Sequence, residues 1–133
     1  MPPVAARRRR LRSGAGDHDA GEILDRPGAA LMDRVHREHP DCDAVFFVND
    51  DLAQGAVFQC ARLGLAVPGR IGLVGFHDLA GSAWTTPPLS TIATPRYEIG
   101  LAAAGLLMRH LAGEAIERRH VDLGFELVRR QTT

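Results

Sequence analysis

Residues 45–79 read VFFVNDDLAQGAVFQCARLGLAVPGRIGLVGFHDL, and they decide the fold because two apolar runs typical of buried strands each end in polar residues. Asn49 and two aspartates follow the first run, and His77 and Asp78 follow the second. In an open parallel sheet, small ligands bind beyond the carboxyl ends of neighbouring strands. Polar side chains at two such ends therefore predict a shared small-molecule site.

The same polar residues have a second interpretation as helix caps. An Asn or Asp between a strand and a helix commonly accepts a hydrogen bond from the first N–H groups of the helix. Capping alone would account for Asp50 or Asp51, and for these two residues both interpretations stay open. For Asn49 the sequence favours contact with a ligand.

Helical and strand patterns alternate along the rest of the chain, which predicts a layered α/β domain with right-handed crossovers. The run at 44–48 is apolar throughout, so we expect a strand covered on both faces. Residues 129–133 are expected to fray. The expected elements are a helix from Pro27 to about His39, a strand at 44–48, a helix at 51–63, a strand at 71–76, a loop or edge segment at 81–88, a strand at 90–93, a helix after Thr94 and a strand at 121–128.

The helix expected at 51–63 has apolar residues on two sides. At 100° per residue, one broad face suits the sheet and comprises Leu52, Ala53, Ala56, Val57, Cys60 and Leu63. Phe58 and Ala61 fall on the opposite side, near Gln54. This outer stripe suggests a surface for a partner, although a single exposed Phe is common in proteins without one.

Thr94 and Pro95 are typical of a helix start, with Thr94 as the N-cap and Pro95 at the first helical position. Gly113 is expected to close this helix. We expect one inner, core-facing stripe, in which His110 is a satisfied core histidine, made of Ile99, Ala102, Ala103, Leu106, Leu107 and His110.

The charge of the chain and its apolar runs bear on nucleic-acid binding and localisation. The chain carries 16 basic and 16 acidic residues, a formal net charge of zero that gives no general attraction to nucleic acid. The one basic cluster, Arg7–Arg10 with Arg12, could be a nucleic-acid arm, but the sequence favours a solvated tail. There is no signal-peptide pattern and no apolar run of the ~18 residues that a membrane span needs. We expect a cytoplasmic protein.

Catalysis and metal binding have little support in the sequence. Nucleophile-elbow, zinc-helix, phosphate-loop and dinucleotide motifs do not occur, so neither an enzyme nor a cofactor is expected. His36 and His39 form a weak candidate metal pair, for which a solvated helix end is the favoured interpretation. Cys42 and Cys60 are expected to pack rather than to pair in a disulfide.

Four ordered blocks resemble the effector-binding domain of LacI/GalR-type bacterial transcriptional repressors. The likeness runs from about Pro27 to Arg130, and GFHDLAGS at 75–82 is most similar to the gluconate-repressor branch. The blocks are VFFVNDDLAQGA at 45–56, LGLAVPGRIGLVGFHDL at 63–79, TTPPLSTI at 85–92 and TPRYEIGLAAAGLLMRHL at 94–111.

The resemblance implies a parallel-sheet lobe of a periplasmic-binding-protein-like fold, truncated at its N-terminus. We expect a basic, irregular segment at 1–24 and a partial effector-binding and dimerisation domain at 25–133. The DNA-binding region and the other lobe of such proteins have no counterpart in this sequence. DNA would be reached only through that missing region, and the chain looks like a truncated or mis-started product, or a fragment of a longer reading frame.

Family members bind their effector, commonly a sugar, sugar acid or purine, through the residue matching Asn49 and the residue after the GF pair. Here the latter is His77, where many members have an acceptor-only Asp. Because His can donate to an anion, or pair with it when charged, the departure favours a sugar acid over a neutral sugar. Asp78 would orient the loop.

The resemblance also implies a homodimer. In the family, the helix matching 51–63 and the segment matching 81–86 build the interface, which here would comprise Gln54, Phe58, Ala61 and Trp84. Phe58 and Trp84 are large aromatic residues of the kind that anchor such interfaces. The alternative for Trp84 is that it tucks under its own Pro87–Pro88 loop.

Two functions from different classes remain. The first is the effector-sensing and dimerisation portion of a LacI-type repressor, with a sugar or sugar acid as effector. The alternative is a solute-binding module of the periplasmic-binding-protein superfamily that serves sugar transport. The missing secretion signal and the blocks VPGRIGLVGFHDL and TPPLSTIATPR favour the regulator.

Overall fold

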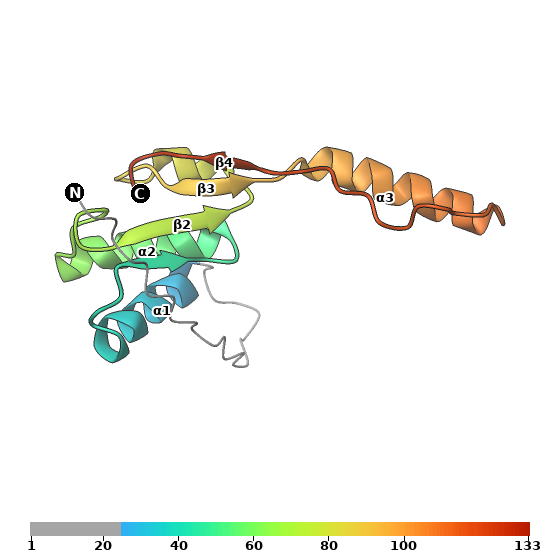
Figure 1. The fold of residues 1–133 in the computed structure, drawn as a ribbon. Coiled ribbons are helices and arrows are strands. Elements are labelled where there is room, and N and C mark those ends of the chain that lie inside the picture. The colour runs from blue at the N-terminus through green and yellow to red at the C-terminus, as the bar shows by residue number, and fades with distance from the viewer. Residues whose placement is uncertain (1–24) are drawn as a thin grey trace, which may run out of the picture.

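A four-stranded sheet organises the chain, for which the computed structural model describes residues 25–133 (Figure 1). Its strand order is β1-β2-β3-β4; the first three strands are parallel and β4 is antiparallel to β3. The α/β fold with a parallel-dominated sheet is therefore confirmed. The predicted basic segment at 1–24, with its arginine cluster, lies outside the described residues. The strands are β1 (Ala44–Phe46), β2 (Gly72–Phe76), β3 (Ser90–Ala93) and β4 (Glu126–Val128).

The helices divide into a packed pair and a projecting one. α1 (Asp25–Glu38) packs on α2 (Asp50–Leu63), and α2 packs on β2. Gly28 permits the close approach of the two helices, because a Cβ there would collide with the Leu52 carbonyl. The sheet with α1 and α2 forms the body of the structure. α3 (Arg96–Leu111) points away from this body, and the chain after it returns alongside, so that residues 96–125 form an arm (Figure 1).

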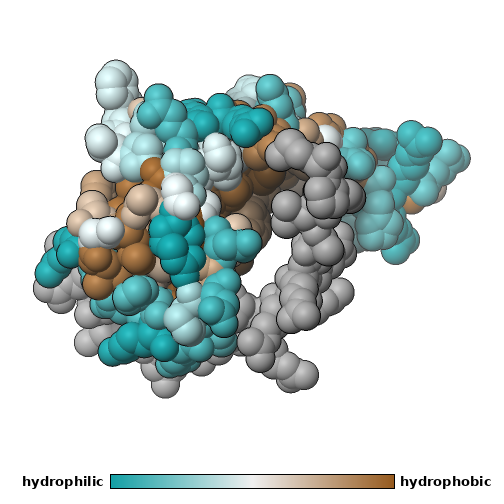
Figure 2. Space-filling model, turned by 60° about the vertical axis from the view of Figure 1, so that its left-hand side comes forward, coloured by the Kyte–Doolittle hydropathy of each residue, from teal (hydrophilic) through white to brown (hydrophobic). Residues whose placement is uncertain are grey.

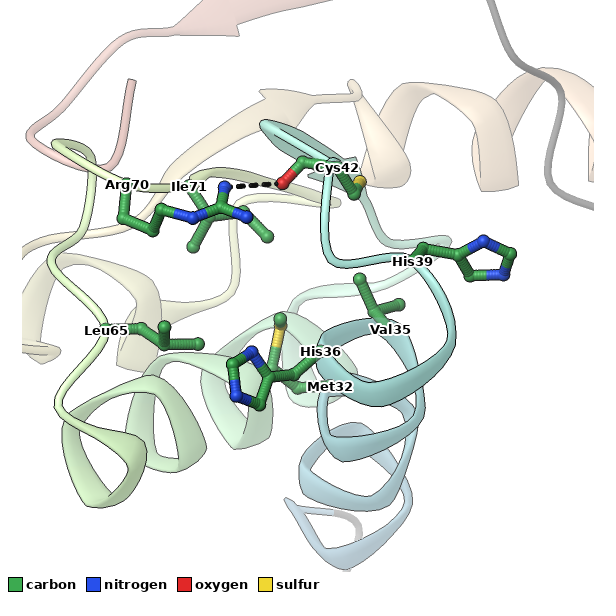
Figure 3. A pocket seen from close by; sticks show the side chains of 8 residues that line it. All are labelled: Met32, Val35, His36, His39, Cys42, Leu65, Arg70 and Ile71. Carbon is green, nitrogen blue, oxygen red and sulfur yellow. Dashed lines mark hydrogen bonds between the residues drawn. The ribbon is translucent and has the colours of Figure 1, made fainter.

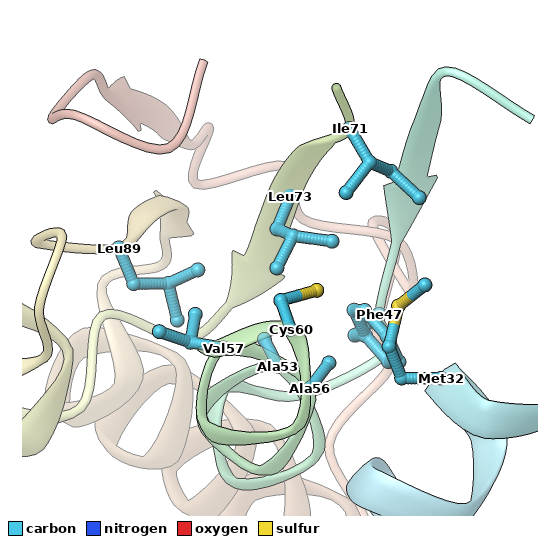
Figure 4. Packing of buried hydrophobic residues seen from close by; sticks show 9 residues of the cluster. All are labelled: Met32, Phe47, Ala53, Ala56, Val57, Cys60, Ile71, Leu73 and Leu89. Carbon is cyan, nitrogen blue, oxygen red and sulfur yellow. The ribbon is translucent and has the colours of Figure 1, made fainter. Parts of the chain in front are cut away.

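The core lies between the α1–α2 pair and the sheet (Figure 4). Ala53, Ala56, Val57 and Cys60 on α2 are buried in it, as the helical pattern predicts, whereas Leu63 is exposed. Burial of each larger side chain stabilises the fold by roughly 1.5–3 kcal/mol. The cluster comprises Met32, Phe47, Ala53, Ala56, Val57, Cys60, Ile71, Leu73 and Leu89.

α2 is bounded by well-formed caps. The Asn49 side chain accepts a hydrogen bond from the Leu52 N–H at 2.9 Å, and Gly64 ends the helix in the left-handed conformation with φ of 68°. Glycine adopts this conformation without the cost that other residues incur. The helix begins one residue earlier than the predicted 51–63.

The prediction that the strand at 44–48 is covered on both faces is wrong for the described chain. β1 spans only Ala44–Phe46, and Phe46 and Val48 are 57% and 70% exposed. α2 contacts β2, and α1 lies on α2 at the same side of the sheet, so the other face of the sheet lacks a covering helix among residues 25–133 (Figure 1).

The predictions for the α3 region need correction. Pro95, not Thr94, precedes the first helical residue, and no side chain caps the helix. None of the residues of α3 is buried, so the predicted inner stripe at Ile99, Ala102, Ala103, Leu106, Leu107 and His110 faces no core, and His110 is exposed rather than a core histidine. The reason is that no other described helix or strand packs closely on α3.

The C-terminal residues are ordered rather than frayed. Thr132 is fully buried; its hydroxyl donates to the Leu73 carbonyl at 2.6 Å and accepts from the Ser90 N–H at 2.8 Å. By contrast, the strand predicted at 121–128 is reduced to β4, because residues 121–125 run along the arm without pairing. A 3-10 helix, η1 (Ala80–Trp84), occupies part of the segment predicted as loop or edge at 81–88.

Candidate functional site

The carboxyl ends of the parallel strands bring two predicted site residues to the same edge of the sheet. Phe46 of β1 pairs with Val74 of β2, so Asn49 and His77 each lie three residues beyond a matched pair. The His77 N–H donates to the Ile92 carbonyl of β3 at 2.7 Å, which ties it to the third strand. The edge is therefore the one that the sequence predicts for a ligand.

Asn49 serves as the cap of α2 and keeps further hydrogen-bonding capacity. Its Oδ1 accepts the Leu52 N–H, while the two N–H groups of its amide take no part in that bond. The side chain is half-buried. Capping and ligand contact are thus compatible at Asn49.

His77 contacts two residues that limit its ring orientation. Its Nδ1 lies 3.5 Å from the Thr94 hydroxyl, and its ring packs edge-on against Phe76 with centroids 4.6 Å apart. Thr94 belongs to this site, which the sequence did not show because a threonine before a proline is typical of a helix cap. The Nε2 atom of the same ring is not involved in the Thr94 contact.

Asp78 is held by an ion pair. Arg130 Nη2 lies 2.7 Å from the Asp78 carboxylate, and Arg130 Nη1 donates to the Leu89 carbonyl at 2.8 Å. Both side chains of the pair are largely shielded, at 20% and 31% exposed. Arg130 could not be predicted as a partner of Asp78, because it lies 52 residues away in a segment expected to fray.

The backbone at His77 and Asp78 has positive φ, 103° and 50° respectively. Residues with a Cβ rarely adopt such angles, and each costs on the order of 1–3 kcal/mol unless the surrounding structure enforces it. The turn after β2 must therefore be held in this conformation by contacts with neighbouring residues.

Asp50 makes several hydrogen bonds that hold the turn after β2. Its fully buried carboxylate accepts hydrogen bonds from the Leu79 N–H and the Ser82 hydroxyl, each at 2.7 Å, and from the Thr91 hydroxyl at 2.5 Å. Both oxygens are engaged with residues outside α2. The capping interpretation for Asp50 is therefore wrong, and capping of this helix belongs to Asn49.

The predicted interface residues lie on α2 and η1. Gln54 donates from Nε2 to the Ser82 hydroxyl at 3.4 Å, which links the two elements. Phe58 is 51% exposed and Trp84 is 86% exposed, while Ala61 is also exposed. Trp84 is thus not tucked under the Pro87–Pro88 loop. Apolar patches interrupt the hydrophilic surface of the body in Figure 2.

A separate hollow lies at the opposite, amino end of the strands (Figure 3). Arg70 closes it by donating to the Cys42 carbonyl at 2.8 Å and to the Pro40 carbonyl. Its volume of about 10 Å³ suffices for one water molecule. His36 faces the hollow and His39 points away, so the two do not converge (Figure 3). Within residues 25–133 no three potential metal ligands gather, and no helix is long and apolar enough to cross a membrane.

Comparison with known proteins identifies the family. A model of the periplasmic binding protein-like domain matches residues 3–133. The HTH-type transcriptional regulator GntR of Pseudomonas aeruginosa is 45% identical over 132 residues, which cover 94% of this chain and 38% of that protein. The chain belongs to the periplasmic binding protein-like domain family, and its homologues are LacI-family transcriptional regulators.

Solved structures agree with this assignment. The transcription regulator GntR from Chromobacterium violaceum superposes with a TM-score of 0.72 at 46% identity, over 86% of this chain and 45% of that one. The transcriptional regulator CelR in complex with cellobiose gives a TM-score of 0.76 at 27% identity, over 85% of this chain and 35% of that one. The chain thus spans less than half the length of these relatives, and the relatives favour the regulator over the transport module.

Proposed function

We propose that this chain is the effector-sensing and dimerisation part of a LacI-type transcriptional repressor whose effector is a sugar or sugar acid. The observation that carries the proposal is the register that delivers Asn49 and His77 to one edge of a parallel sheet. The homologous regulators match over the same region. Binding to DNA would belong to another part of the protein, in the cytoplasm.

The chemistry of the edge suits binding rather than catalysis. Asp50, the most deeply buried acid, has both carboxylate oxygens engaged in hydrogen bonds and is not available as a general base. Asp78 is likewise paired with Arg130. Asn49, His77 and Thr94 offer an amide, an imidazole and a hydroxyl, which recognise hydroxyl and carboxylate groups without transforming them.

His77 favours an anionic effector. The imidazole can donate a hydrogen bond to a carboxylate, whereas an aspartate at this position would repel an acid. Cellobiose in the CelR complex shows that a structural relative accommodates a carbohydrate. A sugar acid such as gluconate combines the two requirements, hydroxyl groups and a negative charge.

The arm supplies the reason to expect a second half of the site. Its exposed apolar residues give α3 the composition of a packed helix without a partner in residues 25–133. Because α3 starts directly beyond β3, a lobe packed on it would face Asn49 and His77 across a cleft. We infer that this lobe lies in the part of the relatives that the chain does not match. The exposed residues of the arm are Tyr97, Ile99, Leu101, Leu107, Met108, Leu111, Val121, Leu123 and Phe125.

The test uses a hybrid regulator, defined as the Pseudomonas aeruginosa relative with residues 25–133 of this chain in place of its matching segment. Calorimetric titration should show gluconate binding that Asn49→Ser weakens at least tenfold, a loss of about 1.4 kcal/mol. Serine keeps the capping oxygen but removes the amide donors, so the melting temperature should stay nearly unchanged. Arg62→Ala, at the far end of α2, is the control and should bind as the parent does.

A second substitution tests the charge of the effector. His77→Asp should lower the affinity of the hybrid regulator for gluconate and raise its relative preference for glucose. If Asn49→Ser and His77→Asp leave both affinities unchanged, the effector does not bind at this edge and the proposed site is wrong.

A further inference from the structure

Asp50 is joined to two separate stretches of chain that carry different candidate surfaces. One oxygen accepts from Thr91 on β3; the other accepts from the Leu79 N–H after β2 and from Ser82 on η1. The carboxylate is fully buried, with 0% of the residue exposed. No hydrogen bond joins it to the N–H groups of its own helix, since Asn49 caps α2.

The structure leaves space for this carboxylate. A Cβ on Gly75 would collide with Asp50 Oδ1, so the glycine in β2 lets the side chain lie directly beneath the end of the strand. Thr91 extends the connection, because its hydroxyl also accepts the Asp78 N–H at 3.3 Å. Asp50 is thus connected to both residues that follow His77, directly at Leu79 and through Thr91 at Asp78.

The second connection leads to the exposed aromatic surface. Ser82 donates to Asp50 and lies in η1, the same short helix that presents Trp84. Gln54 on α2 donates to the Ser82 hydroxyl, which places one of the predicted interface residues on the same network. His77 and Trp84 therefore lie at the two ends of a loop, residues 77–84, that is hydrogen-bonded to one buried carboxylate.

We propose that Asp50 is a positioning residue that fixes the 77–84 loop and thereby couples the His77 side of the effector site to the Trp84 surface. The coupling of an effector rests on the proposed function, whereas the loop geometry does not. An effector that displaces His77 moves a backbone whose neighbouring N–H groups are tied to Asp50 and Thr91. The displacement reaches η1 through the shared carboxylate.

Selective substitutions separate positioning from general stability. Thr91→Val removes the connection to Asp78 on the His77 side and leaves the direct Leu79 bond, whereas Ser82→Ala removes the connection on the Trp84 side. Asp50→Asn disturbs both, because an amide cannot accept at all of the positions where the carboxylate does. Asp51→Asn is the matched control: it makes the same charge change one residue along, in the same first turn of α2.

The readouts are nuclear magnetic resonance signals of the whole 133-residue chain. Trp84 is the single tryptophan, so its indole N–H reports on η1 without ambiguity. The ring signals of His77, assigned with His77→Gln, report on the other side. We expect Thr91→Val to shift mainly the His77 signals, Ser82→Ala to shift mainly the indole signal, Asp50→Asn to shift both, and Asp51→Asn to shift neither.

Amide exchange and effector binding complete the test. Asp50→Asn should accelerate exchange of the Leu79 amide at least tenfold, and it should weaken gluconate binding to the hybrid regulator at least tenfold, while Asp51→Asn changes both less than threefold. If the parent hybrid binds no sugar or sugar acid but the signals and exchange respond as expected, the proposed function fails and loop positioning stands.

The proposal is overturned if Thr91→Val and Ser82→Ala shift both reporters equally, in proportion to their loss of stability. It is also overturned if Asp50→Asn behaves as Asp51→Asn does. Should Asp50→Asn fail to fold, the Thr91 and Ser82 variants still decide the question, because each leaves the carboxylate in place.

Discussion

The body and the arm of this chain both contain helices with many apolar residues, but these residues are buried in the body and exposed in the arm. In the body, the apolar face of α2 is buried against β2 and α1, and the core residues there are almost fully shielded from water. In the arm, α3 has more large apolar residues than α2 and buries none of them. The difference shows that an apolar helical face predicts a partner, but not that the partner lies within the same stretch of chain.

The largest contrast is expected between matched leucines in the two regions. Leu73 on β2 is fully buried and Leu107 on α3 is 56% exposed. Leu73→Ala should destabilise the chain by about 2–5 kcal/mol, whereas Leu107→Ala should change stability by less than about 0.5 kcal/mol. Urea unfolding of the 133-residue chain measures both. Equal losses would show that the arm packs on something within this chain.

The C-terminal residues pack on the body, and substitution of Thr132 tests how much they contribute to its stability. Thr132→Val keeps the shape of the side chain but leaves the Ser90 N–H and the Leu73 carbonyl without their hydroxyl partner. A buried polar group without a partner costs about 1–3 kcal/mol, and the free energy of unfolding should fall by that amount. Gln131→Ala, at the exposed residue directly before Thr132, is the neighbouring control. A neutral effect of Thr132→Val would restore the prediction that the last residues fray.

Two ion pairs sharpen the comparison at a smaller scale. Asp78–Arg130 in the body is largely shielded from water, whereas Arg109–Glu114 in the arm is about half exposed on both sides. Asp78→Asn should lower the free energy of unfolding measurably, while Glu114→Gln should change it by less than about 1 kcal/mol, because exposed pairs are screened by solvent. Urea unfolding at low and high salt separates them. A larger salt dependence for the Glu114 pair is expected.

The smallest expected effect concerns Cys60. Burial raises the pKa of its thiol from the ordinary value of 9.0 to about 11, because the thiolate is poorly solvated in the core. The folded state thus holds this proton more tightly than the unfolded state does. The stabilisation is fully present below pH 9 and is lost as the pH rises from 9 towards 11. At pH 8, iodoacetamide should modify Cys42 and leave Cys60 intact; rapid modification of Cys60 without denaturant would contradict its burial.

Much of the body could be predicted from the sequence because its signals are local. Apolar runs locate the strands, and Gly64 and Asn49 bound α2 through contacts with residues only a few positions away. β3 was predicted at its observed bounds, 90–93, since the prolines before and after it leave little alternative.

The remainder could not be predicted, because it depends on residues far apart in the sequence. The Asp50 network spans 29 to 41 residues, and neither Asp50 nor Arg130 carries a local signal that names its partner. Thr94 is a second case. Its place before Pro95 is typical of a helix cap, so its contact with His77 could not be predicted. The position of Asn49 and His77 on one edge was predicted, while their contact with an effector stays a prediction.

The most direct test of the proposed effector site is hydrogen–deuterium exchange of the hybrid regulator with and without gluconate. We predict that gluconate slows exchange at the start of α2, residues 49–52, and in the turn at 77–79, with a further decrease along α3 as the cleft closes. Unchanged exchange at 49–52 and 77–79, with protection confined to other parts of the protein, would contradict an effector site at this edge of the sheet.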